Sequence, residues 1–168
     1  MQFTFSSMDA ETARTICSWR YEGQYAVYDI GGANEKDVTA EMLDRRSPYY
    51  AVRDEHGEVV GFFNFGSSAQ VWDSAEPGIY AESRTVTIGL GLRPDLTGQG
   101  RGIGLAFVNA GLAFAREQFA PKHLRMYVMT FNTRAIRVYE EVGFRHMRVF
   151  TQHNIHGELE FLEMSREA

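Results

Sequence analysis

A run of glycines stands directly before a long apolar helix pattern, and this segment predicts chemistry most clearly. The run reads TGQGRGIG over residues 97–104, and residues 105–119 place Leu105, Val108, Leu112 and Ala115 on one helical stripe. The first amides of a helix have no intrahelical acceptor, and the helix dipole adds about half a positive charge there. Glycines let the backbone come close to a ligand, so the pattern predicts a loop that binds a phosphate or pyrophosphate.

Two common phosphate loops do not fit these residues. A nucleotide P-loop needs lysine and then serine or threonine after its last glycine, whereas Ile103, Gly104 and Leu105 stand here. A dinucleotide-binding loop needs the spacing G-x-G-x-x-G and an acidic residue about 20 residues further on, and neither is present. A nucleotide-binding α/β protein and a glycine turn without any ligand therefore remain as weaker alternatives.

The spacing Q/R-x-x-G-x-G/A does fit the loop. Gln99, Gly102 and Gly104 satisfy it, with Arg101 between them. In this respect the loop resembles the pyrophosphate loop of the GCN5-related N-acetyltransferase (GNAT) superfamily, and residues 102–116 resemble its central helix. Residues 131–146, FNTRAIRVYEEVGFRH, are similar to a second signature of that superfamily. The residues that match it are Asn132, Ala135, Ile136, Tyr139, Gly143 and Phe144.

The register of the loop has an alternative. Anchoring the motif on Pro94 would place Thr97 at the Gln/Arg position, with Gly100 and Gly102 as its two glycines. We prefer Gln99, because the apolar spacing of the following helix then aligns. The resemblance is specific over residues 84–146, looser over 49–83 and only topological over 1–48.

The resemblance implies acetyl-coenzyme A as cosubstrate, no metal, and transfer of the acetyl group to an amine. Pyrophosphate would lie on the backbone amides of residues 100–104, and the pantetheine arm would pair like an extra strand with residues 91–93. Amides near Leu92 would polarise the thioester oxygen, as an oxyanion hole does. The residues implied to bind the cosubstrate are Gly91, Leu92, Arg93, Gln99, Gly100, Arg101, Gly102, Ile103, Gly104 and Asn132.

Helix 133–142 supplies the candidate general acid. Tyr139 lies one helical turn before Gly143, where the superfamily often keeps a tyrosine aimed at the sulfur, and the alternative is a tyrosine packed on the sheet. Asn132 is placed to cap this helix, to contact the pantetheine arm, or to do both. Arg134 and Arg137 are candidates for the adenosine phosphate, although a solvated helix face is the simpler explanation for each.

The general base is not evident from the residues. Many relatives carry a glutamate seven residues ahead of the proline, and Thr87 stands there in this sequence. A hydroxyl of ordinary pKa cannot act as a base. Either a water molecule relays the proton, or a loop brings in one of four candidates, which are Glu82, His153, His156 and Glu158. Thr87 also keeps open a non-catalytic alternative, an acyl-coenzyme A sensor of the same fold.

The acceptor is an amine on a small molecule or a protein. An aromatic groove would suit a cationic amine, and the negative charge of the chain favours one weakly. A protein, a polyamine, an aminoglycoside and an amino acid are all open as acceptors. Core packing is the competing explanation for many of the candidate aromatic residues, which are Trp19, Tyr21, Tyr25, Tyr28, Phe63, Phe65 and Trp72.

The elements that position these residues are those of a mixed α/β fold. Strands are expected at residues 2–5, 49–53, 58–65, 84–92, 124–129, 144–152 and 159–164, and helices at 8–19, 35–45, 105–119 and 133–142. Residues 67–81 read as a loop. The order predicts a mixed, mostly antiparallel central sheet flanked by helices, with one helix crossing between neighbouring strands.

Composition sets the outer limits. The 168 residues predict one domain over 1–168, and 44% apolar with 23% charged residues is typical of a globular protein. The net charge of −5, without a basic cluster, argues against a nucleic-acid partner. Cys17 is the only cysteine, and we expect neither a signal peptide nor a membrane segment, and hence a cytoplasmic protein. By analogy with its relatives, a homodimer is a candidate assembly.

Overall fold

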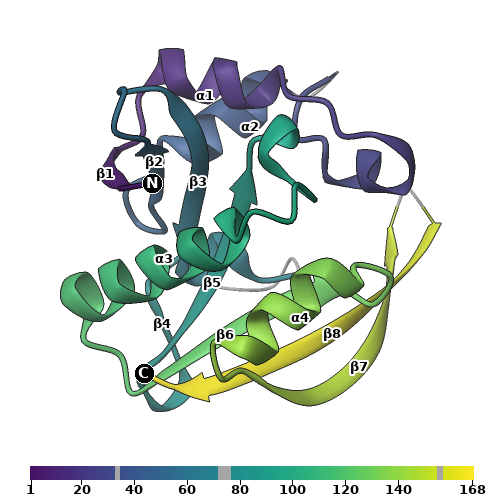
Figure 1. Ribbon diagram of the computed structural model, residues 1–168. Coiled ribbons are helices and arrows are strands. Elements are labelled where there is room, and N and C mark those ends of the chain that lie inside the picture. Colours follow the sequence, from purple (N-terminus) through teal and green to yellow (C-terminus); the bar gives the residue numbers. More distant parts are fainter. Residues whose placement is uncertain (33–34, 72–76, 155–156) are drawn as a thin grey trace.

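The computed structural model describes residues 1–32, 35–71, 77–154 and 157–168. Its centre is a mixed sheet in the order β1-β2-β3-β5-β6-β8-β7, with β4 paired to β5 (Figure 1). The strands are β1 (Thr4–Ser7), β2 (Tyr49–Arg53), β3 (Val59–Phe65), β4 (Tyr80–Ala81), β5 (Thr85–Leu92), β6 (His123–Met129), β7 (Arg145–Asn154) and β8 (Gly157–Glu167).

Helices connect these strands, and side chains cap α1 and α4 at their N-termini. They are α1 (Ala10–Cys17), α2 (Glu35–Met42), α3 (Ile103–Phe119) and α4 (Thr133–Glu141), with short 3₁₀ helices η1 (Gly23–Tyr28), η2 (Gly66–Ala69), η3 (Glu82–Arg84) and η4 (Pro94–Leu96). Asp9 accepts a hydrogen bond from the backbone N–H of Thr12 (2.8 Å), and Asn132 caps α4 in the same way through Ala135 N (3.2 Å).

The sheet is antiparallel except at its centre. Hairpins join β2 to β3 and β7 to β8, whereas α3 crosses from β5 to β6 and these two strands pair in parallel. A parallel pair needs such a crossover connection, and a helix usually supplies it. The expected mixed, mostly antiparallel sheet with a central crossing helix is confirmed.

The central strands separate soon after they pair. The parallel ladder between β5 and β6 runs from Thr85 and His123 to Ile88 and Met126, yet β5 continues to Leu92 and β6 to Met129. Beyond Ile88, β5 stays paired with β3, and beyond Met126, β6 stays paired with β8. The two halves of the sheet therefore splay apart, and a gap opens between the carboxyl ends of β5 and β6.

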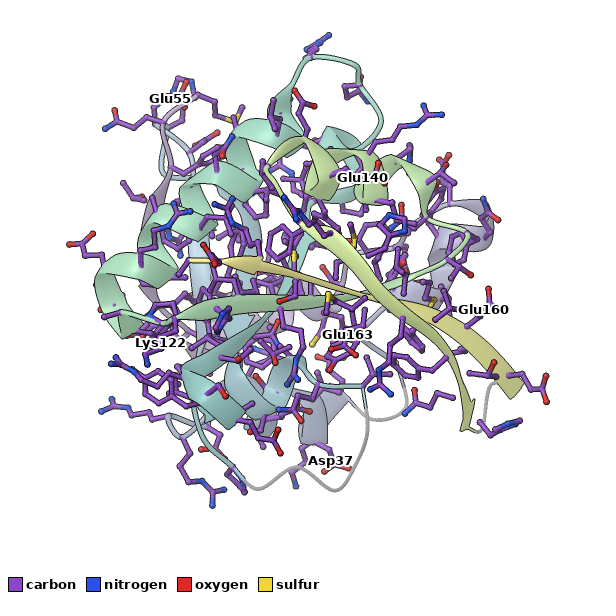
Figure 2. All side chains as sticks on the ribbon, turned by 90° about the horizontal axis from the view of Figure 1, so that it is seen from below. Asp37, Glu55, Lys122, Glu140, Glu160 and Glu163 are labelled. Atoms are coloured by element: carbon purple, nitrogen blue, oxygen red, sulfur yellow. The ribbon has the colours of Figure 1, made fainter. Side chains whose placement is uncertain are left out.

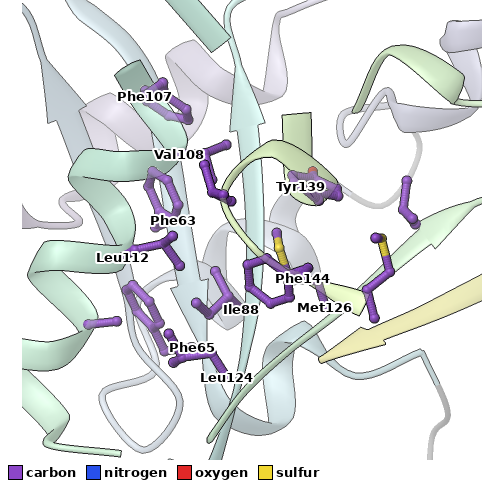
Figure 3. Packing of buried hydrophobic residues seen from close by; sticks show 14 of the residues in the cluster. Phe63, Phe65, Ile88, Phe107, Val108, Leu112, Leu124, Met126, Tyr139 and Phe144 are labelled. Atoms are coloured by element: carbon purple, nitrogen blue, oxygen red, sulfur yellow. The ribbon is translucent and has the colours of Figure 1, made fainter. Parts of the chain in front are cut away.

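Two apolar clusters hold the helices on opposite faces of the sheet. The larger one packs α3 and α4 against residues such as Phe63, Ile88 and Met126 (Figure 3). The smaller one packs α1 and α2 against Phe62, whose side chain leaves the sheet on the face opposite to that of Phe63. In the described part of the chain, no helix is long and apolar enough to cross a membrane.

Most expected elements are confirmed, with local corrections. The loop expected over 67–81 contains η2 and the short strand β4, because Tyr80 and Ala81 extend the sheet beside β5. Helix α3 begins at Ile103, two residues before the expected start, so that Gly104 lies in its first turn. The aromatic segment after Trp19 folds as the 3₁₀ helix η1.

Candidate active site

A cavity of about 800 Å³ occupies the gap between β5 and β6. Its walls come from η1, β3, β5, the glycine loop, the first turns of α3, the end of β6 and α4. Apart from Arg93, it is lined by every residue that sequence motifs assign to the cosubstrate or to catalysis. Segments that lie far apart in the sequence thus meet in one place (Figure 1).

The glycine loop forms one end of the cavity. Gly98, Gly100 and Gly102 have φ values of +67°, +64° and +70°, which place them in the left-handed region that favours glycine. Gly102 is the N-cap residue of α3, so the unpaired amides of the first helical turn lie at the cavity wall. The loop therefore has the geometry of an anion site at a helix N-terminus.

Arginines stand around this anion site. Arg101, Arg134 and Arg137 all line the cavity. The guanidinium of Arg134 lies beside Gly98, and its Cζ is 4.1 Å from the centre of the Tyr25 ring. Guanidinium groups match phosphate geometry well, so this end of the cavity is suited to a ligand with several phosphate charges.

The free edge of β5 forms the adjoining wall. Arg93 N donates to Val60 O (2.8 Å), and hydrogen-bonded residues alternate along an antiparallel ladder. The backbone groups of Gly91 and Arg93 therefore face β3, and those of Leu90 and Leu92 face the gap. Of residues 91–93, Leu92 thus presents its backbone to the cavity, and Leu90 presents a second peptide unit deeper in the gap.

Arg93 itself is turned to other partners. Its guanidinium pairs with Asp95 (2.7 Å) and with Glu58 (3.4 Å), and both carboxylates are exposed. Its backbone amide is engaged with β3, as described above. The structure therefore does not bring Arg93 to the cavity with the other predicted residues.

Tyr139 lies deep in the cavity wall and is 7% exposed. Burial, and to a smaller extent the neighbouring Tyr28, raise the pKa of Tyr139 well above that of a free phenol. Burial disfavours the phenolate, so the hydroxyl keeps its proton across the physiological range. Figure 3 shows Tyr139 on α4 above Phe144 and Met126. Tyr139 thus keeps a protonated hydroxyl at the wall of the cavity.

Asn132 combines two interactions at the start of α4. Its Oδ1 accepts from Ala135 N, and its Nδ2 donates to the Tyr28 hydroxyl (3.1 Å). Burial raises the pKa of Tyr28. The expected helix cap is confirmed, and the side-chain amide also ties η1 to α4 across the cavity.

The segment 21–28, which we call the aromatic strap, closes the cavity over the gap. Tyr21 donates its hydroxyl to Leu92 O (2.8 Å) on the β5 side, and Tyr25 packs on Phe131 (5.5 Å between ring centres) on the other side. Burial raises the pKa of Tyr21 to about 12, so it remains a donor. Tyr21, Tyr25 and Tyr28 line the cavity as the aromatic-groove hypothesis expects.

The other candidate aromatic residues have different places. Phe63 and Phe65 are buried in the larger core, and Trp19 packs on the smaller one, so core packing explains all three. Trp72 lies outside the described residues.

The candidate bases do not gather in the cavity. Thr87 is 1% exposed, and its hydroxyl accepts from Arg125 Nε (3.2 Å) and NH2 (3.0 Å). His153 pairs with Glu158 (3.4 Å) at the exposed end of the β7–β8 hairpin, and Glu82 is exposed on η3. None of these four residues lines the cavity, and His156 lies outside the described residues.

Other carboxylates near the sheet are also engaged. Glu163 pairs with Arg148 (2.5 Å), and Glu160 accepts from the Thr130 hydroxyl (2.8 Å), at different points along β8 (Figure 2). Among the described residues that line the cavity, Glu141 is the only carboxylate and there is no histidine. The described residues contain no group of three or more His, Cys, Asp or Glu side chains that could hold a metal.

Sequence motifs missed part of the lining. A methyl group at Gly89 would lie 2.2 Å from Asn64 Oδ1, and one at Gly91 would lie 2.2 Å from the Phe62 ring. A glycine within a strand often marks such a close approach, so the two glycines of β5 were the available signal. The lining residues without a sequence motif include Tyr49, Phe62, Asn64, Ser68 and Tyr127.

The likeness to known proteins agrees with this geometry. The model of the acetyltransferase (GNAT) family matches residues 13–144. Mycothiol acetyltransferase from Acidothermus cellulolyticus is 31% identical over 140 residues, which are 82% of this chain and 40% of that protein. The chain thus spans about 40% of the length of this curated relative.

Solved structures show the same fold. A GNAT-family acetyltransferase from Bacillus anthracis superposes with a TM-score of 0.74 at 14% identity, covering 99% of this chain and 95% of that one. A chimera of spermidine N-acetyltransferase SpeG from Vibrio cholerae and hSSAT gives a TM-score of 0.72 at 15% identity, covering 99% and 96%. The chain belongs to the GNAT family of acetyltransferases.

Proposed function

We propose that this protein is an acetyl-coenzyme A-dependent N-acetyltransferase. The observation that carries the proposal is the meeting of an anion-binding helix N-terminus and an unpaired strand edge in one cavity. The family shares this function, but the contacts described below belong to this chain. The acceptor is a primary amine on a small molecule or a protein.

The cavity fits an extended, phosphate-bearing thioester along its length. Backbone amides at residues 102–104 would hold the pyrophosphate, with Arg101 and Arg134 beside them. The peptide groups of Leu90 and Leu92 would pair with the amides of the pantetheine arm as a further strand does. Gln99, whose Nε2 donates to Asp95 O (3.0 Å), stabilises the loop rather than the ligand.

Acetyl-coenzyme A supplies an activated acyl carbon. Residues of the chain would polarise its carbonyl oxygen and protonate the leaving thiolate. The Leu90 N–H points into the gap beyond the end of the ladder, where it can donate to the thioester oxygen. This places the oxyanion donor two residues deeper than the Leu92 amide. The neutral amine attacks, a C–N bond forms and the C–S bond breaks. Tyr139 gives its proton to the leaving thiolate.

Water takes up the protons that the reaction releases. The acceptor ammonium, with a pKa of about 10, loses one proton to water before it attacks. The attacking nitrogen sheds a second proton as the amide forms, and Tyr139 recovers its own through water. Because Glu141, the only carboxylate among the described lining residues, is exposed at the end of α4, we assign both transfers to water.

An acceptor screen tests the proposal. The protein is incubated with acetyl-coenzyme A and a panel of amines that includes spermidine, glucosamine and amino acids, and release of free thiol is followed. Amine-dependent release, together with mass spectrometric detection of an acetylated amine, is expected. Tight binding of acetyl-coenzyme A without release for any amine would instead support the non-catalytic sensor, which Thr87 in place of an acidic residue favours.

A further inference from the structure

Asn64 places a polar atom at the fork of the splayed strands. The residue is 5% exposed, yet it lines the cavity. It pairs across the ladder with Gly89, which is the first residue of β5 beyond the end of the pairing with β6. Asn64 Oδ1 lies directly over Gly89, at the place that a methyl group there would occupy. The amide therefore reaches over β5 to the mouth of the gap.

The orientation of this amide is set by its neighbours. Asn64 Nδ2 donates to Ser68 Oγ (3.2 Å), and Ser68 Oγ in turn donates to Phe65 O (3.4 Å). The Ser68 backbone N–H donates to Ser47 Oγ (2.7 Å), which holds this turn in place. Because Asn64 Nδ2 is the atom that donates to Ser68 Oγ, the NH₂ group lies on the Ser68 side. The carbonyl oxygen is left facing the cavity.

Asn64 Oδ1 has an acceptor capacity that the protein does not use. No described residue donates a hydrogen bond to it, and the atom is not sealed from solvent, so a ligand in the cavity can reach it. The atom lies on the opposite face of the sheet from α3 and α4, as Phe62 does, two residues earlier on β3. An acceptor amine that approaches from this face would meet Oδ1 beside the Leu90 peptide.

We propose that Asn64 Oδ1 binds the acceptor amine and orients it toward the thioester carbon. This inference rests on the proposed function. A neutral amide oxygen accepts an N–H hydrogen bond from either the ammonium or the free amine, and it takes no proton. It thus turns the nitrogen lone pair toward the acyl carbon while the proton leaves to water. Gly89 is required because any side chain there would displace Oδ1.

A binding experiment tests this without turnover. Propylamine is titrated into the ¹⁵N-labelled protein saturated with coenzyme A, and the side-chain amide signals of the asparagines are followed. The Asn64 pair, identified by its loss in Asn64→Ala, is expected to shift more than any other asparagine pair. No shift at Asn64, in a protein that binds coenzyme A, would overturn the assignment. Failure to bind coenzyme A at all would instead contradict the proposed function.

Kinetics of acetyl transfer to propylamine sharpen the test. Removing one hydrogen bond to a charged group predicts that Asn64→Ala lowers kcat/KM for the amine about 10- to 100-fold, with the Kd for acetyl-coenzyme A unchanged. Gly89→Ala should act in the same direction. Asn109→Ala, on the exposed side of α3, is the control and should match the wild type. Equal rates in Asn64→Ala and the control would contradict the proposal.

An isosteric variant separates orientation from general structural support. In Asn64→Asp the carboxylate has the same shape, can accept from the Ser68 hydroxyl once that hydroxyl turns away from Phe65 O, and can take the amine proton as well. The pH profile of kcat/KM for propylamine is therefore expected to move to lower pH. A residue with a purely structural role would lose activity in this variant without any displacement of the profile.

Discussion

The two ends of the cavity are built in different ways. At the end proposed to bind the cosubstrate, backbone groups form the lining, namely the amides after Gly102 and the peptide units of Leu90 and Leu92. At the end proposed to bind the acceptor, side chains from η1, β3 and β6 form it, and Tyr28 and Asn64 are examples. Backbone sites need a local conformation, which a short motif encodes. Side-chain sites need the whole fold to bring distant residues together.

This difference would allow the side chains at the proposed acceptor end to vary while the proposed cosubstrate end stays the same. The peptide groups of a splayed strand are present whatever side chains the strand carries. The aromatic strap and Asn64 can change without disturbing them. Substitutions at the first end should therefore change the affinity for the cosubstrate, and substitutions at the second end should change the kinetics with the amine.

Tyr139→Phe should have the largest effect, because the variant removes the proton donor at the junction of the two ends. General-acid catalysis is typically worth about 100- to 10,000-fold, so kcat should fall within this range while acetyl-coenzyme A affinity stays unchanged. Steady-state kinetics and calorimetry measure the two quantities. Tyr50→Phe, outside the cavity lining, is the control. A normal rate in Tyr139→Phe would make this tyrosine structural.

Gly102→Val tests the backbone end alone. A side chain at φ +70° strains the loop and stands where the pyrophosphate belongs, so two or more charged hydrogen bonds are lost. Acetyl-coenzyme A affinity should fall about 100-fold or more in calorimetry. Gly57→Val, at φ +80° in the β2–β3 turn, carries similar strain away from the cavity and should bind normally. Retained affinity in Gly102→Val would refute the loop assignment.

The pH dependence probes the acceptor end. Because water is the proposed proton acceptor, the rate follows the fraction of free amine, which rises about tenfold per pH unit below the amine pKa of about 10. The raised pKa of Tyr139 keeps this acid protonated over the same pH range. Loss of its proton is therefore not expected to lower kcat/KM within that range. A plot of log kcat/KM for the amine should rise with unit slope from about pH 6 to pH 9. A plateau near neutrality would reveal a histidine or carboxylate base.

Tyr21→Phe should have the smallest effect. It removes the hydrogen bond by which the aromatic strap contacts β5. The Tyr21 hydroxyl occupies the Leu92 carbonyl that the pantetheine arm would use. Removing this competitor should tighten acetyl-coenzyme A binding about two- to tenfold, as expected for one neutral hydrogen bond. Calorimetry measures the change. Weaker binding would mean that the strap supports the bound cosubstrate and does not compete with it.

Much of the fold and of the cosubstrate end could be predicted from the sequence. The order of strands and helices follows from local periodicity, and Gly102, Asn132 and Tyr139 stand in motifs of fixed spacing. An open strand edge at residues 91–93 was expected only by resemblance, and the splay between β5 and β6 opens an edge of β5 there. Leu90 and Leu92 face the gap because of the register in which β5 pairs with β3. Hydrogen bonds between the strands set this register.

The acceptor end could not be predicted in the same way. Asn64 becomes informative only when β3 pairs with β5 and sets it opposite Gly89. Phe63 and Phe65 stand on either side of it in the sequence, but alternation turns them to the core. The described candidate bases do not line the cavity, and the reason is related. Residues such as Glu82 and His153 are polar and exposed, and the topology carries them away from the cavity.

A calorimetric titration with acetyl-coenzyme A, with ATP and NAD as controls, tests the central claim most directly. We expect one tight site for acetyl-coenzyme A and no comparable heat of binding with ATP or NAD. Binding of ATP or NAD in preference to acetyl-coenzyme A, or no binding of any of the three, would contradict it. In that case the roles assigned to the loop, to Tyr139 and to Asn64 would all be lost.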